Sequence, residues 1–280
     1  DLKIEPRDGP VEPILRSQLS EEQATQILED AWATGGAKFM GAIGDQLMDE
    51  EANRFAKEFV HRKIHETVTD QETANLLCPT NHPIGTRRIC VDTGYYETYN
   101  RENVTLLSVK DNPIEEITEN GVIVNGELTA LDTLVLATGF DAMTGALLNM
   151  DIRGREGLAL SKKWHAGPRS YLGIAVADFP NLFTITGPGS PSVLSNMMVS
   201  IEQHVDWVID CLAHMKEQDL KVFEAQSQAE DQWVSHVNDV ASMTLFPKGG
   251  SWYLGANVEG KPRIFMPYAA GVGVYREVCD

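Results

Sequence analysis

The sequence predicts an α/β fold that follows a block of helices, and three observations support this. A short apolar run, Leu134 to Leu136, ends in Ala137-Thr138-Gly139, as expected for a fully buried strand of a parallel sheet. Short strand-like segments precede this run, whereas helical spacing of apolar residues dominates the first 82 residues. Because small residues at the carboxyl end of a strand let the backbone approach a ligand closely, we expect a ligand there.

The helical block is predicted from capping patterns and apolar spacing. Ser20 and Gln23 have the spacing of a capping box, which predicts a helix that continues to about Trp32. Three more helices are expected on similar grounds, at residues 37–48, at residues 49–67, and after Asp70 as far as Pro79.

From Pro83 onward, glycines, turns and short strands replace the helical pattern. Strands are expected at Val104–Val109, Ile114–Thr118 and Gly121–Glu127, with Asn120-Gly121 as the turn between the last two. They lead into the segment Leu131–Phe140, LDTLVLATGF, which is predicted to be the buried strand described above.

The remainder of the chain alternates glycine-rich loops with helical patterns. A second buried strand is expected at Asn181–Thr186, where it leads into Gly187-Pro188-Gly189. Long helices are expected at Met198–Gln218 and Ala225–Ala241. The last part, from Phe246, is expected to form loops with short strands.

Composition narrows the class of function. The 280 residues are 42% hydrophobic and 23% charged, which is typical of a globular protein with a sizeable core. The net charge of −18 disfavours binding to nucleic acid or to an anionic membrane. No run approaches the roughly 18 apolar residues that span a bilayer. The amino terminus has neither an initiator Met nor a signal pattern and is interpreted as a cut into a longer chain.

The distribution of cysteine and histidine predicts neither disulfides nor a metal site. The four cysteines are scattered without metal-ligand spacing, which favours reduced thiols in a cytoplasmic protein. His61 and His65 lie one helical turn apart, but no third ligand or HExxH pattern accompanies them.

Three features could carry chemistry. Arg87 and Arg88 form either a solvated surface pair or an anion site, for which a planar guanidinium is well suited. Trp252, flanked by glycines, is either a packed aromatic or a flat side chain that covers a ligand. The stretch Gly187–Met198 forms either a tight turn or a helix amino end directed at an electronegative cofactor. Its serines do not fit GxSxG, which disfavours a hydrolase.

The motifs together resemble those of the Baeyer–Villiger monooxygenases, class B flavoprotein monooxygenases that use FAD and NADPH. The resemblance is strongest to the phenylacetone and steroid monooxygenase branch and extends over most of the chain. It is carried by GTRRI (85–89), GYYETYNRENV (94–104), LDTLVLATGFDAMTGAL (131–147), AGPRSYLG (166–173), GPGSPSVLSNM (187–197) and SWYLGAN (251–257).

The resemblance implies roles for individual residues. Arg88 matches the active-site arginine, which would stabilise the negatively charged C4a-peroxyflavin and the adduct that it forms with a ketone. Arg87 matches the position that meets the 2′-phosphate of NADPH, and Trp252 matches a loop tryptophan that packs over NADP. Met197 matches a residue whose backbone approaches the flavin of FAD. The loop that shapes the substrate pocket is matched by Pro191, Ser192, Val193 and Leu194.

The resemblance also implies a fold and a domain map. The family has two Rossmann-like dinucleotide-binding domains with a helical insertion. Residues 1–82 would be this insertion in the NADP domain, residues 83–143 the second half of the NADP-binding domain, and residues 144–280 the carboxyl-terminal part of the FAD-binding domain. The two GxGxxG fingerprints of the family are absent here. The chain is therefore interpreted as the carboxyl-terminal half, with the amino-terminal half as its partner.

The implied activity is the conversion of ketones to esters or lactones with O2, in the presence of the amino-terminal half. N- or S-oxidation by the same class of flavoprotein is an alternative, although the context of Arg88 and the motif DAMTGAL (141–147) favour ketone oxidation. A non-catalytic scaffold built from half an enzyme is a second alternative. In each case we expect exposed sheet edges and apolar faces that a partner normally covers.

Overall fold

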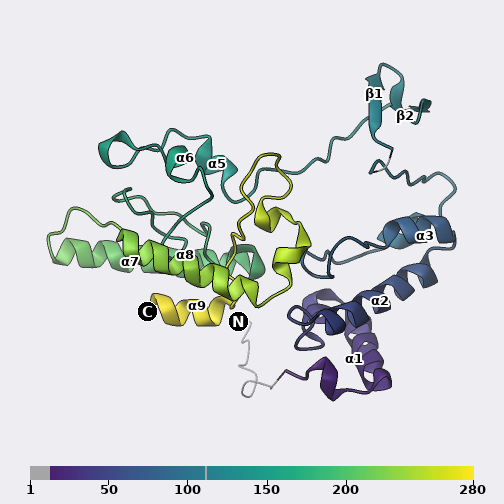
Figure 1. Ribbon diagram of the computed structural model, residues 1–280, viewed down its shortest axis with the longest axis horizontal. Coiled ribbons are helices and arrows are strands. Elements are labelled where there is room, and N and C mark those ends of the chain that lie inside the picture. The colour runs from purple at the N-terminus through teal and green to yellow at the C-terminus, as the bar shows by residue number, and fades with distance from the viewer. Residues whose placement is uncertain (1–12, 111) are drawn as a thin grey trace, which may run out of the picture. The chain divides into compact units, whose positions relative to one another are not determined.

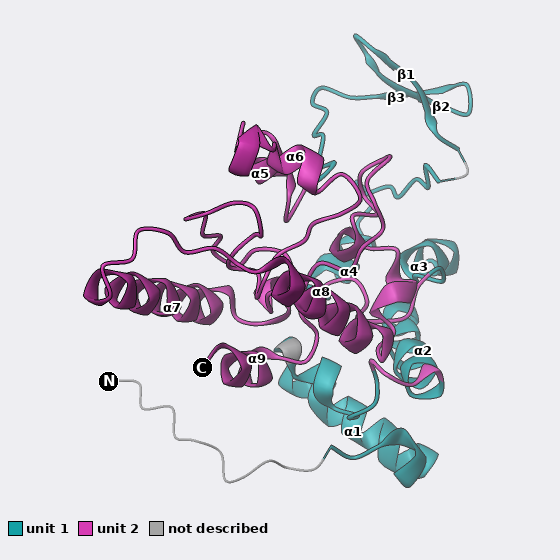
Figure 2. Cartoon of the chain, turned by 60° about the vertical axis from the view of Figure 1, so that its left-hand side comes forward, with its two compact units in different colours: residues 1–46, 51–81, 89–139 teal, residues 47–50, 82–88, 140–280 magenta. Residues whose placement is uncertain are grey.

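The computed structural model describes residues 13–110 and 112–280, which form two compact units (Figure 2). Unit 1 contains the residues up to Gln46 together with residues 51–81 and 89–139. Unit 2 contains residues 47–50, 82–88 and 140–280. The division of the chain into domains at residues 82 and 143 stays a prediction.

Two helices of unit 1 begin where the sequence predicts, because their caps are local. Helix α1, Glu21–Thr34, begins with a capping box in which the Ser20 hydroxyl accepts from the Gln23 amide at 3.2 Å. The Gln23 side chain accepts in return from the Ser20 amide at 2.9 Å. Helix α3, Gln71–Leu77, is the third labelled helix of Figure 1. It begins where the Asp70 carboxylate accepts from the Thr73 amide at 2.8 Å. The side-chain oxygens satisfy amide groups that have no partner within the helix.

The rest of the helical block follows the sequence only in part. Helix α2, Glu50–Thr67, confirms the third predicted helix. The predicted helix at 37–48 was wrong, because only a 3₁₀ turn, η2 at Gly36–Gly41, forms there. Glycine weakens a helix, and at Gly44 the chain packs so closely on Pro13 that an added Cβ would lie 2.3 Å from the proline Cβ. Two further short elements belong to unit 1: η1 at Arg16–Gln18, within the helical block, and α4 at Tyr95–Thr98, after it.

An antiparallel meander forms the sheet of unit 1. Strand β1, Ile114–Thr118, confirms the prediction, and the turn before Gly121 is also present. The segment Gly121–Glu127, expected as one strand, is instead strand β2, Gly121–Val124, and the start of strand β3, Glu127–Ala130. Asn125 and Gly126 lie between them with φ of 54° and 72°, as a tight type I′ hairpin turn requires.

Two predicted strands of unit 1 are absent. Residues 104–109 and the segment Leu131–Phe140 run without strand pairing, and every residue of the second segment is exposed. Val135 is 79% exposed and Leu136 is 71% exposed, so the prediction of a buried strand was wrong for this chain. A parallel strand in the interior of a sheet pairs with a neighbour on each side, and the described residues provide no strand partner for this segment.

Unit 2 is built around helix α8, Ser227–Ser242, and helix α9, Val272–Cys279. Its main core consists of apolar and aromatic side chains from these helices and from two loops: Leu172, Ile174, Trp233, Val237, Val240, Tyr268 and Tyr275. Helix α8 confirms the sequence prediction, whereas α9 replaces the loops expected after Phe246. The shorter helices are α5 at Gly145–Leu148, η3 at Arg155–Gly157, α6 at Leu160–Lys163, η4 at Ser192–Leu194, η5 at Phe246–Gly249 and η6 at Trp252–Leu254.

Two other parts of unit 2 differ from what the sequence predicts or leave apolar surface exposed. The second predicted strand, Asn181–Thr186, was wrong, since only an isolated bridge between Phe183 and Ala175 forms there. Helix α7, Met197–Glu217, is present as predicted and buries Ser200 and His204. Its apolar stripe points the other way and is exposed: Met198, Val205, Ile209 and Leu212.

Among the described residues, none of the helices is both long and apolar enough to pass through a membrane.

Candidate functional site

Both candidate arginines lie in unit 2, directly after the buried Thr86. The Thr86 hydroxyl donates to the Pro83 carbonyl at 2.7 Å, which closes the turn that precedes the arginines. Thr86 also packs on the backbone of Gly249, where an added Cβ would lie 2.7 Å from the Thr86 Cβ. This close approach brings the arginines beside the segment that leads to Trp252.

The two guanidinium groups bind backbone carbonyls. Arg87 donates from Nε to the Gly249 carbonyl at 3.0 Å and from Nη2 to the Gly250 carbonyl at 3.3 Å. Arg88 donates from Nη1 to the Val193 carbonyl at 2.9 Å. Both side chains are exposed, and neither forms an ion pair within residues 13–110 and 112–280. Because an arginine has five N–H donors, each keeps positive charge and donors available for an anion.

Trp252 and the 191–194 loop pack on one apolar cluster. Trp252 is half-buried in η6, and its ring meets that of Tyr253 edge to face at 4.5 Å. Val193, Leu194 and Trp252 each pack against one cluster of buried residues, which consists of Ala241, Phe246, Tyr253, Leu254 and Phe265. Their shared support fixes the spacing between the tryptophan and the loop.

The 191–194 loop has a restrained backbone. Pro191 and Ser192 are buried, and Ser192 has φ of 45°, a conformation that costs free energy for a residue with a side chain. Its hydroxyl donates to the Met143 sulfur at 3.6 Å, and its carbonyl accepts from the Ser195 hydroxyl at 2.9 Å. Surrounding contacts therefore hold the loop that receives Arg88.

Met197 is the first residue of α7. The Asn196 carboxamide caps this helix by accepting from the Met198 amide at 3.0 Å. The amides at the start of a helix have no acceptor within it, and the helix dipole makes this end partly positive. The position suits an electronegative ring edge. The structure thus brings Arg87, Arg88, Trp252 and the 191–194 loop together, and Met197 follows three residues after that loop.

His204 and Tyr275, which the sequence did not single out, form a buried hydrogen-bonded chain. The Thr186 amide donates to Nδ1 of His204 at 2.9 Å, so the proton of the neutral ring must lie on Nε2. Nε2 lies 2.8 Å from the Tyr275 hydroxyl, which donates to the Leu172 carbonyl at 2.5 Å. Burial lowers the pKa of His204 to about 4 and raises the pKa of Tyr275.

The hydrogen bonds of His204 and Tyr275 support the backbone that leads into the candidate site. Thr186 has φ of 53° and begins the run of glycines and prolines that leads to the 191–194 loop. His204 comes from α7 and Tyr275 from α9, so their partners are distant in sequence. The only signal in the sequence was a histidine within an apolar helical pattern, and such residues are more often structural.

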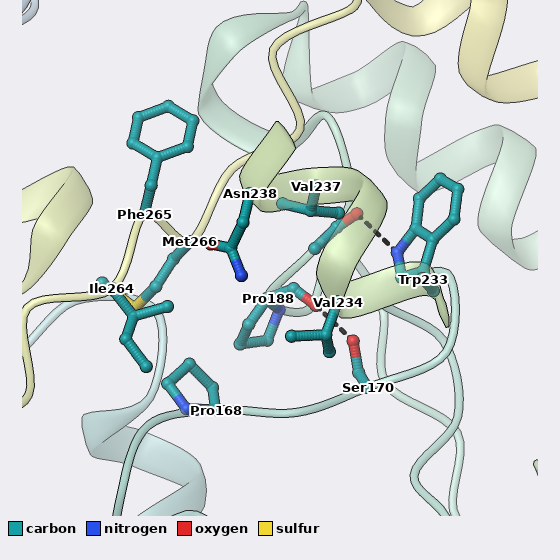
Figure 3. Close-up of a pocket in the computed structure, with 11 residues that line it drawn as sticks. Pro168, Ser170, Pro188, Trp233, Val234, Val237, Asn238, Ile264, Phe265 and Met266 are labelled. Atoms are coloured by element: carbon teal, nitrogen blue, oxygen red, sulfur yellow. Dashed lines mark hydrogen bonds between the residues drawn. The ribbon is translucent and has the colours of Figure 1, made fainter. Parts of the chain in front are cut away.

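A separate small cavity lies between α8 and the segments around Pro188 and Met266 (Figure 3). Its walls are mostly apolar, and Trp233 Nε1 donates beside it to the Gly189 carbonyl at 3.1 Å. Its volume is about 20 Å³, enough for one water molecule at most. Pro188 and Gly189 of the candidate stretch 187–198 line it, whereas Arg87, Arg88 and Trp252 do not.

The chain is similar in sequence to about half of several known monooxygenases. No protein-family model matches the chain. The chain is 43% identical over 261 residues to a cyclohexanone 1,2-monooxygenase of Acinetobacter sp., covering 92% of this chain and 47% of the relative. It is 38% identical over 262 residues to an acetone monooxygenase (methyl acetate-forming) of Gordonia sp. strain TY-5, covering 92% and 49%. It is 41% identical over 269 residues to the phenazine N-monooxygenase PhzNO1 of Lysobacter antibioticus, covering 94% and 49%.

Solved structures agree with these relatives. A steroid monooxygenase bound to NADP superposes with a TM-score of 0.89 at 44% identity, covering 97% of this chain and 50% of that one. A cyclohexanone monooxygenase from Rhodococcus sp. Phi1 bound to NADP+ gives a TM-score of 0.92 at 42% identity, covering 95% and 50%. These neighbours have the predicted fold with two dinucleotide-binding domains, which confirms the fold class. The chain spans about half the length of the relatives that it matches.

Proposed function

We propose that this chain, which matches one half of the Baeyer–Villiger monooxygenases in sequence and in structure, acts as the carboxyl-terminal half of a ketone-oxidising enzyme. Together with the other half, it would convert a ketone to an ester or lactone with NADPH and O2. The observation that carries this proposal is the hydrogen bond from Arg88 to the Val193 carbonyl, at 2.9 Å. It anchors an unpaired cation beside the loop that the resemblance assigns to the substrate pocket.

Arg87, Arg88 and Trp252 fit NADPH. The two guanidinium groups are exposed and form no ion pair in the described part of the chain, although the sequence contains 41 acidic residues. Charge of this kind suits a phosphate, which arginine can bind through two donors at once. Trp252 adds a half-buried aromatic ring in the same region. We infer that Arg87 binds the 2′-phosphate and that Trp252 packs over the nucleotide.

Met197 and the amino end of α7 fit the flavin of FAD. The first amides of α7 have no acceptor within the helix and lie at the partly positive end of its dipole, and the Asn196 cap accepts from only one of them, that of Met198. When bound, FAD would supply the activation of O2 and NADPH the hydride. No GxGxxG pattern is found in the sequence, so the groups that cradle both pyrophosphates must come from elsewhere.

Arg88 would stabilise negative charge that develops on oxygen during the reaction. Its side chain is held at Nη1 by a backbone carbonyl, so its remaining donors keep a fixed direction. A preoriented cation needs little reorganisation in the transition state, and such a group can accelerate a step by about a hundredfold or more. Val193 itself would contribute through its carbonyl oxygen, whereas Pro191, Ser192 and Leu194 would shape the pocket around the ketone.

The test joins this chain to the half of the Acinetobacter cyclohexanone 1,2-monooxygenase that it does not match. We expect Arg88→Ala to lower ester formation about a hundredfold or more while flavin binding is retained. Arg153→Ala is the matched control, because Arg153 is exposed and paired with Asp151 at 2.9 Å. Chromatography of the products and the visible flavin spectrum measure the two effects. Undiminished ester formation by the Arg88→Ala protein would disprove the proposed role.

The missing half is also proposed as the occupant of the uncovered apolar surfaces. Helix α7 exposes Val205, Ile209 and Leu212 on one stripe, and the segment Leu131–Phe140 exposes apolar side chains on backbone that has no strand partner among the described residues. Such surfaces are typical of interfaces, and unpaired extended segments readily add to a sheet. We expect hydrogen exchange in both regions to slow when the other half is supplied.

N-oxidation is a second candidate function, and one observation favours it. The phenazine N-monooxygenase of Lysobacter antibioticus is as close in identity, at 41%, as several ketone-oxidising relatives. The same joined protein separates the two activities when it is given either a cyclic ketone or a phenazine. Formation of the N-oxide without ester would favour the second candidate.

A cytoplasmic location is proposed from the cysteines. All four, Cys78, Cys90, Cys211 and Cys279, are free. Unpaired thiols of this number are usual in a reducing compartment. Fractionation of the source cells would test this.

A further inference from the structure

Lys261 is an unusually buried lysine close to the candidate site. Its side chain is only 10% exposed. The ammonium group contacts the Asp141 carboxylate and donates to the Ala142 carbonyl at 3.1 Å. Asp141 and Ala142 directly follow the exposed Leu131–Phe140 segment and lead into helix α5. The lysine thus binds a turn that is about 120 residues away in sequence.

The stem of Lys261 lies on the turn that contains Trp252. Gly255 ends η6 in a left-handed conformation, with φ of 70°, and its amide donates to the Trp252 carbonyl at 3.0 Å. A Cβ added at Gly255 would lie 2.9 Å from Cδ of Lys261. The lysine therefore covers the backbone that closes the Trp252 turn, while its charged end reaches Asp141.

Further contacts extend this link as far as Arg88. The Asn257 carboxamide donates to the Phe140 carbonyl at 2.8 Å, which is a second tie between the same two segments. On the other side, Met143 has φ of 68°, and its sulfur accepts from the Ser192 hydroxyl. The residue after Ser192 provides the carbonyl that binds Arg88. All of these residues belong to unit 2.

Two other lysine ion pairs of unit 2 are much more exposed than this one, whereas Lys163, 15% exposed, is comparably buried against Asp178 and Glu230. The side chains of Lys221 and Asp219 are 79% and 88% exposed, and those of Lys248 and Glu50 are 57% and 72% exposed. Pairs as exposed as these contribute little to stability. Lys261 is buried, makes two polar contacts with one turn and packs on another, so its loss would leave the Asp141 carboxylate without this partner.

We propose that Lys261 is a positioning residue that fixes the Trp252 turn against the Asp141–Ala142 turn. Through the Trp252 turn it sets the place of the tryptophan, and through Met143 and Ser192 it supports the loop that anchors Arg88. The positioning of the turn is independent of the proposed function. The expected effect of Lys261 on NADPH binding, by contrast, rests on the proposed function.

Lys261→Met tests the proposal, because methionine keeps most of the stem and removes the charge. We expect amide hydrogen exchange of residues 252–258 in the isolated chain to become about tenfold faster, since a lost charged hydrogen bond shifts local opening by about that factor. Lys221→Met is the matched control and should leave this segment unchanged. In the joined protein, we expect KM for NADPH to rise about tenfold while kcat changes by less than about twofold.

A second variant keeps the test decisive if Lys261→Met fails to fold. Asp141→Asn removes the same ion pair from the other side and leaves the contact with Gly255 intact. Faster exchange in 252–258 for either variant, but not for Lys221→Met, supports the proposal. Unchanged exchange in the variants that fold overturns it. Faster exchange in a joined protein without oxygenase activity would overturn the proposed function and leave the positioning role standing.

Discussion

The core around Trp233 and the segment Leu131–Phe140 are both apolar, yet only the first is buried. Trp233 is 5% exposed, packs on Tyr268 and Tyr275, and donates to the Gly189 carbonyl. Leu136 lies in an apolar run whose sequence predicts a buried strand, yet it is 71% exposed. The difference lies in the partners: α8, α9 and the loops around them are all in this chain, whereas the strands that would flank Leu136 are not found among the described residues. Apolar sequence alone does not bury a segment.

The largest effect should come from the core. Trp233→Ala is expected to lower the free energy of unfolding of the chain by about 3 to 5 kcal/mol, because it opens a cavity and removes the hydrogen bond to Gly189. Leu136→Ala, the control, should change it by less than about 0.5 kcal/mol. Urea unfolding followed by circular dichroism measures both. Equal losses for the two variants would contradict the contrast drawn above.

A smaller effect on the free energy of unfolding should come from a change in pH, because His204 lies at the edge of that core and titrates. The pKa of His204 in the folded chain is about 4, below the ordinary value of 6.5. Between pH 4 and pH 6.5, the unfolded chain therefore binds a proton on this histidine that the folded chain does not bind. Its contribution is complete above pH 6.5 and is lost as the pH falls toward 4, by on the order of 3 kcal/mol.

Urea unfolding at several pH values between about 7 and 4 measures this dependence. His204→Gln should flatten the decline, whereas His214→Gln, at an exposed position of the same helix, should not. A decline that is identical in all three proteins would show that His204 does not cause it.

The smallest effect on stability is expected on the exposed face of α7. Ile209 is 57% exposed, so Ile209→Ser should change the free energy of unfolding of the chain by less than about 0.5 kcal/mol. The same substitution should weaken association with the other half, supplied as a separate chain, because it places a hydroxyl in an apolar interface. Glu217→Gln, near the end of α7, serves as the control. Sedimentation of the mixed chains measures the association, and unchanged association would show that this face is not covered.

The sequence predicted best what depends on neighbouring residues. The capping box at Ser20 and the cap at Asp70 act over three residues, and both form as expected. The run Leu134 to Leu136 was misjudged, because its burial depends on strands that the described chain does not provide. Helix α9 was missed since it is short and follows a glycine-rich stretch. Its central Tyr275 is fixed by Leu172 and His204, both far away in sequence.

The candidate site was predictable in its residues but not in its contacts. Arg88 and Trp252 stood out through motif resemblance, and their roles stay a prediction. Nothing in the sequence indicated that Arg88 would bind the Val193 carbonyl or that Lys261 would reach Asp141. Every amino acid has a backbone carbonyl, so the sequence does not show which carbonyl accepts a hydrogen bond. A lysine in a glycine-rich loop is usually solvated. Such contacts become visible only once the chain is folded.

Arg88 is anchored by a main-chain oxygen of the 191–194 loop, so the loop holds the arginine with its backbone and leaves its side chains free for another role. A carbonyl is supplied by every amino acid, so residue 193 can change its side chain without withdrawing the acceptor at 2.9 Å. Substitutions at residue 193 can therefore alter the shape and polarity of the 191–194 loop while the carbonyl that anchors Arg88 is kept. Ser192, with its positive φ, is less free to vary than its neighbour. Under the proposed function, in which this loop lines the substrate pocket, it is a place where new substrate preferences would arise at little cost to the role proposed for Arg88.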